Sequence, residues 1–449
     1  MANPSSFLKN PSITLALTCA ASLSFAPEVW AEAPLKTPPQ GFSPLFNGSD
    51  LGGWWGASTE DPRKYLALSA DDFKTKHDAS LADIQQHWRV ENGTLVNDGK
   101  GLFLTSDRNF GNFELLVDYK TVALADSGVY LRGCPQVQIW DSTEKDKFKL
   151  GADKGSGALW NNSAGAPGKD PLIKADKPFG EWNYLRIVMV GSRVWVWLND
   201  QQTVNGAVME NHYDRKLPVP PRGPIQLQTH GGEISWRNVF IREIGGDEAN
   251  KLLRSTAPEG FKSVFNGKDL TGWAGPLDCC KVEDSAIVWQ PKKGGTIYTE
   301  DEYADFVVRL EFKLPPGGNN GLAIRYPGKG NAAYDAMCEC QVLDDNYEKA
   351  TGQKIDPRQT HGSAYGMVGA LRGYQYPIGE WNYQEVTVSG STIKVELNGT
   401  QILNADLGTV TEFMANSKHP GKDLKSGHFG LAGHNDPVSF RNISIKPLK

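Results

Sequence analysis

The sequence is poor in the features that mark nucleic-acid-binding and membrane proteins. It contains no block of Lys or Arg residues, and its formal net charge is −5. Nucleic acids and anionic membranes are recognised through basic patches, so the composition supports neither partner. Beyond the N-terminal segment, no run is apolar enough to span a bilayer. We therefore expect no nucleic-acid partner and no membrane span, and the sequence does not indicate an oligomeric state.

Cysteine is also scarce, with six residues in 449. If an N-terminal signal containing Cys19 is removed, five remain, and an odd number argues against a full disulfide framework. One bridge between the Cys279–Cys280 pair and the Cys338/Cys340 pair is possible in an oxidising compartment. The equally weighted alternative is that these cysteines are small buried side chains in strands.

Several catalytic signatures are missing as well. No His-Glu-x-x-His motif, Walker loop, dinucleotide fingerprint, nucleophile elbow or Ser-His-Asp order stands out. The sequence therefore gives no motif-based reason to assign a zinc protease, a nucleotide-binding enzyme or a serine hydrolase. No cofactor is certain, and a divalent metal ion is possible but weakly supported.

The N-terminus has the layout of a secretion signal. Lys9 supplies the positive charge, and the run 13–26 is apolar but short for a membrane span. The small residue Ala31 ends a Val-Trp-Ala sequence, which predicts cleavage after it and a signal peptide at 1–31. The mature protein is then expected in the periplasm or outside the cell.

Glycine and tryptophan, by contrast, are abundant, with 48 and 13 residues. Many turns and many aromatic residues suit short strands in a β-sandwich, and exposed aromatic side chains suit sugar binding. A chain of 449 residues is too long for one ordinary core. Its length favours two domains of about 200 residues each.

An internal repeat identifies these two domains. Three motifs occur twice in the same order: Gly-Phe-x-x-(Leu/Val)-Phe-Asn-Gly-x-Asp-Leu-x-Gly-Trp (41–54 and 260–273), Gly-Glu-Trp-Asn-Tyr (180–184 and 379–383) and Arg-Asn-(Val/Ile) (237–239 and 441–443). Chance does not produce such ordered repetition. The chain therefore holds two diverged copies, copy 1 at 41–245 and copy 2 at 258–449, joined by a linker at 246–257.

Strand patterns dominate both copies. Residues 193–198 and 392–397 alternate with period two, and each segment follows a turn rich in Gly and Ser. Regular short strands with turn signals predict an all-β fold of two tandem jelly-roll β-sandwiches. The insertion at 57–87 in copy 1 predicts one or two surface helices, and residues 248–254 of the linker predict a helical turn.

Long polar side chains share one face of a predicted strand in each copy. In copy 2, alternation puts Glu339 and Gln341 on the face opposite Cys340. Such side chains need water or a ligand, and a carboxylate among them suits acid–base work. Trp140 and Trp160 of copy 1 can stack on a sugar face or pack in the core. The matching strand face in copy 1 carries Gln136, Gln138 and Trp140.

Four charged side chains are further candidates for the same two faces. Arg132 and Arg325 end the preceding strands, each two positions from an apolar residue of its own face, so both can reach a cleft. A β-bulge can redirect Asp141 and Asp344 at the strand ends. We expect these groups to contribute to sugar binding.

Histidines complete the set of candidates. His230 and His434 occupy equal positions near the ends of the copies, and His361 follows the strand that carries Glu339. Core histidines with satisfied hydrogen bonds are the alternative, but recurrence beside Gly-rich turns favours a functional role for the pair. Glu339 is the sharpest single candidate because it is a carboxylate near a histidine.

These motifs resemble the 3-keto-disaccharide hydrolase family, whose members are also described as 3-keto-glucoside-1,2-lyase/3-keto-2-hydroxy-glucal hydratase domains. The resemblance covers both copies and includes the Phe-Asn-Gly-x-Asp-Leu-x-Gly-Trp opening, the (Glu/Gln)-x-Gln-(Val/Ile)-(Leu/Trp)-Asp strand and the Gly-Glu-Trp-Asn turn. It implies a concanavalin A-like sandwich in each copy. It also implies a carbohydrate substrate, namely a glycoside whose C3 hydroxyl has been oxidised to a ketone.

Such a substrate can be cleaved by elimination. The C3 ketone acidifies the hydrogen on C2, a base removes it, and the C1 substituent departs. Adding water to the 2-hydroxy-3-keto-glucal completes a net hydrolysis. The reaction needs a base, an acid, and positive charge or a metal at the oxyanion. The resemblance implies that Glu339 and His434 act as base and acid or as metal ligands, and that His361 assists them. It also implies that Arg325, Gln341 and Asp344 bind the sugar.

Copy 1 departs from this pattern because Gln136 stands where copy 2 has Glu339, and glutamine cannot act as a base. Copy 1 can bind sugar without cleaving it, or it can use Asp141 and His230 in another arrangement. For the whole chain, the alternative function is a secreted carbohydrate-binding protein without catalysis, since one sandwich fold serves both purposes.

Overall fold

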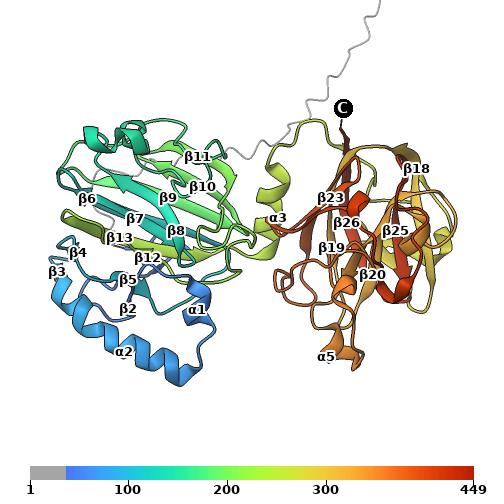
Figure 1. Ribbon diagram of the computed structural model, residues 1–449, viewed down its shortest axis with the longest axis horizontal. Coiled ribbons are helices and arrows are strands. Elements are labelled where there is room, and N and C mark those ends of the chain that lie inside the picture. The colour runs from blue at the N-terminus through green and yellow to red at the C-terminus, as the bar shows by residue number, and fades with distance from the viewer. Residues whose placement is uncertain (1–36, 449) are drawn as a thin grey trace, which may run out of the picture. The chain divides into compact units, whose positions relative to one another are not determined.

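Both copies are β-sandwiches of antiparallel strands, which confirms the all-β prediction (Figure 1). The computed structural model describes residues 37–448, so the predicted signal peptide at 1–31 lies outside the described residues. Between residues 37 and 448, no helix is long and apolar enough to cross a membrane.

Copy 1 pairs an eight-stranded sheet with a five-stranded sheet. The larger sheet has the order β11-β10-β9-β6-β13-β4-β3, with β1 paired to β13, and the smaller has the order β2-β5-β12-β7-β8. The strands are β1 (Ser43–Pro44), β2 (Trp54–Ala57), β3 (Trp88–Glu91), β4 (Thr94–Asn97), β5 (Phe103–Ser106), β6 (Phe113–Thr121), β7 (Asp126–Leu131), β8 (Cys134–Trp140), β9 (Asn183–Val190), β10 (Arg193–Leu198), β11 (Gln201–Val208), β12 (Gln226–Leu227) and β13 (Ile234–Glu243).

Copy 2 repeats this topology strand for strand. Its larger sheet has the order β16-β17-β26-β19-β22-β23-β24, with β14 paired to β26, and its smaller sheet has the order β15-β18-β25-β20-β21. The strands are β14 (Lys262–Ser263), β15 (Trp273–Ala274), β16 (Cys280–Glu283), β17 (Ala286–Trp289), β18 (Gly294–Tyr303), β19 (Phe306–Lys313), β20 (Asn319–Tyr326), β21 (Cys338–Leu343), β22 (Asn382–Ser389), β23 (Thr392–Leu397), β24 (Thr400–Asp406), β25 (Gly427–His434) and β26 (Ser439–Pro447).

Each copy buries an apolar core of its own between its two sheets. In β10 the period-two pattern turns Val194, Val196 and Leu198 inward, and Val395 and Leu397 of β23 are buried in the same way. A fully buried aliphatic side chain contributes about 1.5–3 kcal/mol relative to an exposed one. The alternation seen in the sequence therefore reports which sheet face lies against the core.

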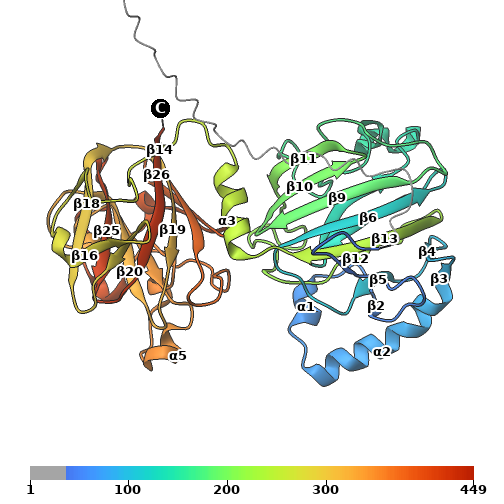
Figure 2. The same ribbon diagram turned by 180° about the vertical axis from the view of Figure 1, so that it is seen from behind.

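The insertion of copy 1 forms the two predicted helices, α1 (Pro62–Leu66) and α2 (Ala70–His87). Ser69 begins α2 as its N-cap, because its side chain accepts a hydrogen bond from the Asp72 amide. Ile84 is buried, and the Gly56 amide donates to Ser80 Oγ over 2.8 Å. These contacts hold α2 along β2 of the smaller sheet (Figures 1 and 2).

The predicted helical turn after copy 1 is a longer helix, α3 (Gly246–Ser255). Asp247 and Glu248 lie in its first turn and Arg254 in its last, an order that suits the helix dipole. The other helical segments are α4 (Ala332–Asp335), α5 (Tyr347–Thr351) and the 3₁₀ turns η1 (Lys145–Leu150), η2 (Ala152–Lys154), η3 (Leu277–Cys279), η4 (Pro357–Gln359), η5 (Leu407–Thr409) and η6 (Met414–Asn416).

The cysteines of the described residues form no disulfide. Cys338 and Cys340 point into the core of copy 2 because they alternate with Glu339 and Gln341 along β21. The bridge considered from the sequence is therefore not formed, and small buried side chains are the observed alternative. The buried free cysteines are Cys134, Cys279, Cys280, Cys338 and Cys340.

Candidate active site

The smaller sheet of copy 2 carries a cleft on the face opposite its core. Strands β18, β20, β21 and β25 line it, together with the loop that precedes α4. Its volume is about 490 Å³, which lies within the range of roughly 300–1,000 Å³ typical of ligand pockets. The lining side chains that carry polar atoms are Thr296, Tyr298, Tyr326, Asn331, Glu339 and His434.

Glu339 lies at the floor of this cleft and is only 2% exposed. Its side chain passes over Gly321 of the neighbouring strand, where an added Cβ would lie 2.0 Å from Glu339 Oε1. The sheet therefore accommodates the carboxylate only because residue 321 has no side chain. A buried carboxylate is costly unless it is paired, and the sequence supplies a partner on β25.

That partner is His434, whose Nε2 lies 3.1 Å from Glu339 Oε1. The hydrogen bond to Glu339 raises the pKa of His434 above its usual value, although burial opposes the shift. His434 remains 45% exposed at the mouth of the cleft. The pair thus places a carboxylate and an imidazole side by side, which is the composition of an acid–base dyad.

Two tyrosines complete this cleft, and a buried amide lies beside Glu339. Tyr298 and Tyr326 pack edge to face at 5.5 Å, and the Tyr326 hydroxyl donates to the Gly330 carbonyl. Gln341 is buried next to Glu339, and its Nε2 donates to Asn319 Oδ1 over 2.8 Å. Aromatic side chains with polar ends are suited to hold a sugar ring.

The structure corrects the expectation that two arginines reach the clefts. Arg325 is 1% exposed, and its guanidinium is held by the Ala304, Gly390 and Leu424 carbonyls and by Asp305. Arg132 is equally buried in copy 1 and donates to the carbonyls of Gly111 and Pro220. Both residues have positive φ, but Arg325 lies at a register shift within β20, whereas Arg132 directly follows β7 in the turn that leads to β8. The left-handed backbone at each position turns the side chain away from the cleft, so both arginines tie loops together.

His361 is another residue that the structure removes from the site. It is 2% exposed, lies against Phe312 and accepts a hydrogen bond from the Leu343 amide at Nδ1. Burial lowers its pKa to about 3, so the ring is neutral. No hydrogen-bond partner is found for its Nε2 within the described residues. His361 therefore belongs to the interior of copy 2.

The two aspartates at the strand ends organise loops. In copy 2, the amides of Gly317 and Asn346 donate to Asp344 over 2.8 Å each. In copy 1, Asp141 accepts hydrogen bonds from the amides of Leu124 and Thr143. Because their carboxylates are engaged with backbone, the expected redirection toward the clefts does not occur.

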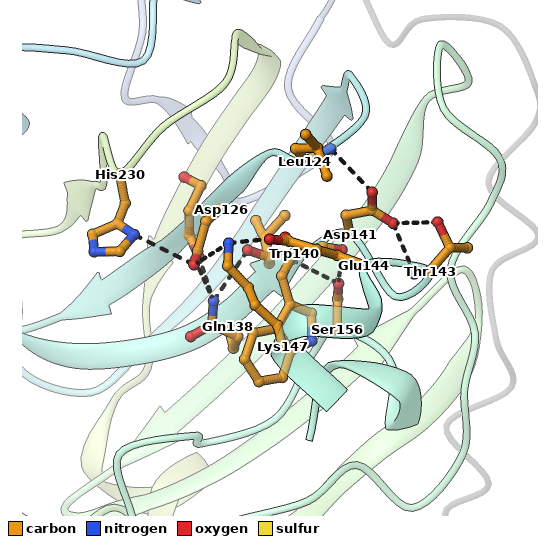
Figure 3. Close-up of polar contacts among 12 residues, drawn as sticks. Leu124, Asp126, Gln138, Trp140, Asp141, Thr143, Glu144, Lys147, Ser156 and His230 are labelled. Carbon is orange, nitrogen blue, oxygen red and sulfur yellow. Dashed lines mark hydrogen bonds and ion pairs between the residues drawn. The ribbon is translucent and has the colours of Figure 1, made fainter. Parts of the chain in front are cut away.

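Copy 1 assembles a different polar cluster around Asp126, at the start of β7 (Figure 3). His230 Nδ1 and Lys147 Nζ lie 3.3 and 3.0 Å from Asp126 Oδ2, and Gln138 Nε2 donates to Oδ1 over 2.8 Å. Gln136 in turn donates to Gln138. Burial by itself would raise the pKa of Asp126, but the hydrogen bonds from His230 and Lys147 outweigh it and lower the pKa.

The two tryptophans proposed to stack on sugar lie beside this cluster. Trp140 is buried, and its indole N–H donates to the Gly155 carbonyl. Trp160 packs edge to face against it at 6.0 Å, and the Lys169 ammonium covers its ring at 4.3 Å. Trp140 therefore packs as a structural side chain, and Trp160 has one face engaged by a cation.

The residues that the sequence did not single out are Asp126 and Lys147 in copy 1 and the tyrosines of the copy 2 cleft. Asp126 directly precedes the Ser-Gly that matches Asn320-Gly321. When the repeats are aligned, Asp126 of copy 1 therefore corresponds to Asn319 of copy 2. The carboxylate of Asp126 at a position where copy 2 has an amide could have identified Asp126 as a candidate from the sequence. Lys147 lies in a segment unlike its counterpart, and its approach to Asp126 depends on the fold.

Metal ligation was left open by the sequence. Among residues 37–448, no group of three or more His, Cys, Asp or Glu side chains is arranged to hold a metal ion. The Glu339–His434 pair supplies two such side chains in contact.

Comparison with known proteins places these features in a context. A curated protein named 3-keto-disaccharide hydrolase, from Bacteroides thetaiotaomicron, is 27% identical over 266 residues, which cover 50% of this chain and 91% of that protein. A crystal structure of a candidate glycosyl hydrolase from Parabacteroides distasonis is 26% identical, with a TM-score of 0.38, over 43% of this chain and 95% of that one. A carbohydrate-binding module from Bacillus subtilis is 13% identical, with a TM-score of 0.27, over 39% and 96%.

The sequence profile of one domain family matches the chain twice, at residues 41–242 and 260–446. These ranges follow the internal repeat and contain both polar clusters. The chain therefore belongs to the 3-keto-alpha-glucoside-1,2-lyase-like domain family and carries two copies of that domain.

Proposed function

We propose that copy 2 cleaves 3-keto-glycosides by elimination across C1 and C2, followed by hydration. The observation that carries the proposal is the Glu339–His434 pair, joined over 3.1 Å and open to a cleft of about 490 Å³. Membership of the family and the name of the Bacteroides relative support the same substrate class.

Each side chain has a definable part in the reaction. Glu339 takes the acidic proton from C2, and the electron pair of that bond forms the enediolate with the C3 carbonyl. The C1–O bond then breaks, and His434 gives its proton to the departing oxygen. Thr296 and Asn331 line the same cleft and carry hydrogen-bond donors for the developing oxyanion.

Two environmental effects support this assignment of roles. The hydrogen bond to Glu339 raises the pKa of His434, which favours the protonated imidazole that an acid requires. Glu339 is withdrawn from water and packed over Gly321, so its position is fixed before substrate arrives. We further propose that the protein acts after export, with the signal removed after Ala31.

The direct test follows the full-length mature chain on 4-nitrophenyl 3-keto-glucosides of both anomers. NMR would detect the 2-hydroxy-3-keto-glucal, and absorbance would detect the released phenol. We expect Glu339→Gln to lower turnover at least tenfold, because a positioned general base contributes about 10²–10⁴-fold. The exposed strand carboxylate of Glu283 provides the matched control, and Glu283→Gln is expected to keep wild-type turnover.

Two results would contradict the proposal. Unchanged turnover in Glu339→Gln would remove Glu339 from the chemistry. Binding of the keto-glycoside without turnover by the wild-type chain would favour the carbohydrate-binding alternative. Repeating the assay after treatment with a chelator tests whether a divalent ion takes part.

A further inference from the structure

In each copy, a histidine contacts one carboxylate, but that carboxylate comes from a different strand in the two copies. In copy 2, β20 pairs with β21 so that Gly321 faces Gln341, and in copy 1, β7 pairs with β8 so that Gly128 faces Gln138. With these pairs aligned, Asp126 of copy 1 corresponds to Asn319 of copy 2. By the same register, the residues corresponding to Glu339 and His434 are Gln136 and His230.

Acid and amide have therefore changed places between neighbouring strands. Copy 2 has the acid on β21 (Glu339) and the amide on β20 (Asn319), whereas copy 1 has the amide on β8 (Gln136) and the acid on β7 (Asp126). The histidine bonds to the acid in both cases. In copy 1, Gln138 Nε2 donates to Asp126 over 2.8 Å, and in copy 2, Gln341 Nε2 donates to Asn319 over the same distance.

Hydrogen bonds and an ion pair fix the side chains of the copy 1 cluster in position. Gln136 donates to the Gln138 oxygen and so aims the Gln138 amide at Asp126. Gln136 also lies over Gly128 as Glu339 lies over Gly321, since an added Cβ there would be 2.9 Å from its amide carbon. Lys147 joins Asp126 and Glu144, at 3.0 Å each. Within residues 37–448, the Glu339–His434 pair makes no such ion pair with a lysine.

The cluster is reachable from solvent, but it is shallower than the copy 2 cleft. The His230 side chain is 61% exposed, and Asp126 and Lys147 are 11% and 22% exposed. The inner part of the sheet face is filled by Tyr130, which stands where copy 2 has Ala323 and packs on Phe103 at 5.2 Å. A ligand would therefore enter at the His230 end.

We propose that copy 1 holds a second acid–base site for 3-keto-glycosides, in which Asp126 takes the part of Glu339 and His230 that of His434. The Asp126 carboxylate accepts the C2 proton, and the electron pair of the C–H bond forms the enediolate. The C1–O bond breaks, its electron pair stays on the glycosidic oxygen, and His230 protonates that oxygen. Water then adds across the glucal double bond. Lys147 is placed to stabilise the enediolate oxygen.

This inference rests on the function proposed for copy 2, and the test separates the two. Turnover of the 4-nitrophenyl 3-keto-glucoside is measured for the full chain, for Glu339→Gln, for Asp126→Asn and for the double variant. We expect Glu339→Gln to keep a residual rate that Asp126→Asn lowers at least a further tenfold. Asp146→Asn, an exposed neighbour on η1, is expected to leave that residual rate unchanged.

Each outcome has one meaning. A double variant no slower than Glu339→Gln overturns the copy 1 site and leaves the proposed function of copy 2 standing. Loss of all turnover in Asp126→Asn, with Glu339→Gln unaffected, supports the copy 1 site and overturns the role of Glu339. A wild-type chain without turnover overturns both. If Asp126→Asn does not fold, His230→Gln changes a mostly exposed side chain and is expected to give the same loss.

A rescue experiment separates chemistry from structure. Adding Gln136→Glu to the Asp126→Asn/Glu339→Gln chain returns the carboxylate to the strand that carries it in copy 2. We expect this triple variant to regain at least part of the residual rate, because Gly128 leaves room for the side chain that reaches toward His230. No recovery, with the fold intact by circular dichroism, would count against an acid–base role for the cluster.

Discussion

At the scale of single residues, the same side chain has opposite properties in two places of copy 2. His434 gains a carboxylate partner at a cleft mouth, which raises its pKa, whereas His361 is enclosed without a charge partner, and burial lowers its pKa to about 3. Desolvation penalises the charged form, and a neighbouring anion favours it. Their different surroundings favour the protonated form of His434 and the neutral form of His361.

The titration of His434 gives a prediction at this scale. We expect its midpoint to lie above 6.5 in the wild-type chain and to fall in Glu339→Gln, because the variant removes the carboxylate that holds the proton. Imidazole resonances followed by NMR across pH measure both midpoints. His230 lies in the other copy and serves as the internal control, since its midpoint depends on Asp126. An unchanged His434 midpoint would contradict the ion pair between His434 and Glu339.

The sign of the accompanying stability change is fixed by the same shift. A histidine whose pKa is raised on folding binds its proton more tightly in the folded state. The stabilisation is complete below the unfolded pKa of about 6.5 and is lost as pH rises through the higher folded value. We therefore expect the Glu339–His434 pair to stabilise copy 2 under mildly acidic conditions and to contribute less at alkaline pH.

At the scale of elements, strand pairing decides which residues can meet. Glu339 reaches His434 by crossing β20, and it can do so only at Gly321, where an added Cβ would clash at 2.0 Å. The strand that lies between Glu339 and His434 thus contains a residue without a side chain. Gly321 is required at this position because the Glu339 side chain approaches it closely. The backbone conformation does not require a glycine there, since the φ of Gly321 lies outside the left-handed region.

Gly321→Ala is the corresponding prediction. The methyl group would push Glu339 out of the floor, so we expect turnover to fall at least tenfold, because a misplaced base loses its alignment with C2. Gly245→Ala is the control: no heavy atom lies within 4 Å of its added Cβ, and its φ is −72°. Kinetics of both variants, with circular dichroism for folding, make the comparison. Wild-type turnover in Gly321→Ala would show that the carboxylate position is not critical.

At the scale of the whole molecule, a duplicated scaffold carries two differently built polar sites. Both copies keep the same sheet order. Both also keep a glycine beneath a side chain of the neighbouring strand, with Gly128 under Gln136 in copy 1 and Gly321 under Glu339 in copy 2, and a histidine at the corresponding position. They differ in the filling of the inner face and in the presence of Lys147. Such differences change depth and electrostatics without changing the fold, since sites vary on a common framework.

The thiols offer a check on the whole chain. Because the five described cysteines are unpaired and buried, we expect five reactive thiols per chain when the mature protein is unfolded without reductant. Before unfolding, the reaction should be slow, since burial raises the pKa of Cys134, Cys338 and Cys340 and disfavours the thiolate. Three thiols after unfolding would indicate that one bridge forms in the exported protein.

The sequence by itself determined the duplication and the sandwich class, and it proposed Glu339 and His434, which the structure brings into contact. These properties follow from local patterns: repeated motifs, period-two alternation in β10 and β23, and the alternation of polar and apolar side chains between the two faces of β21. The same local reasoning separated Glu339 from Cys338 and Cys340, because side chains alternate across a strand.

Only the tertiary structure decided which candidates meet. Arg132 and Arg325 turn away to bind backbone carbonyls, His361 enters the core, and Asp141 and Asp344 bind backbone amides. Asp126, His230 and Lys147 come together from segments far apart in the chain. Pairing register and side-chain burial are long-range properties, so residue type and spacing alone could identify the chemistry available but not its assembly.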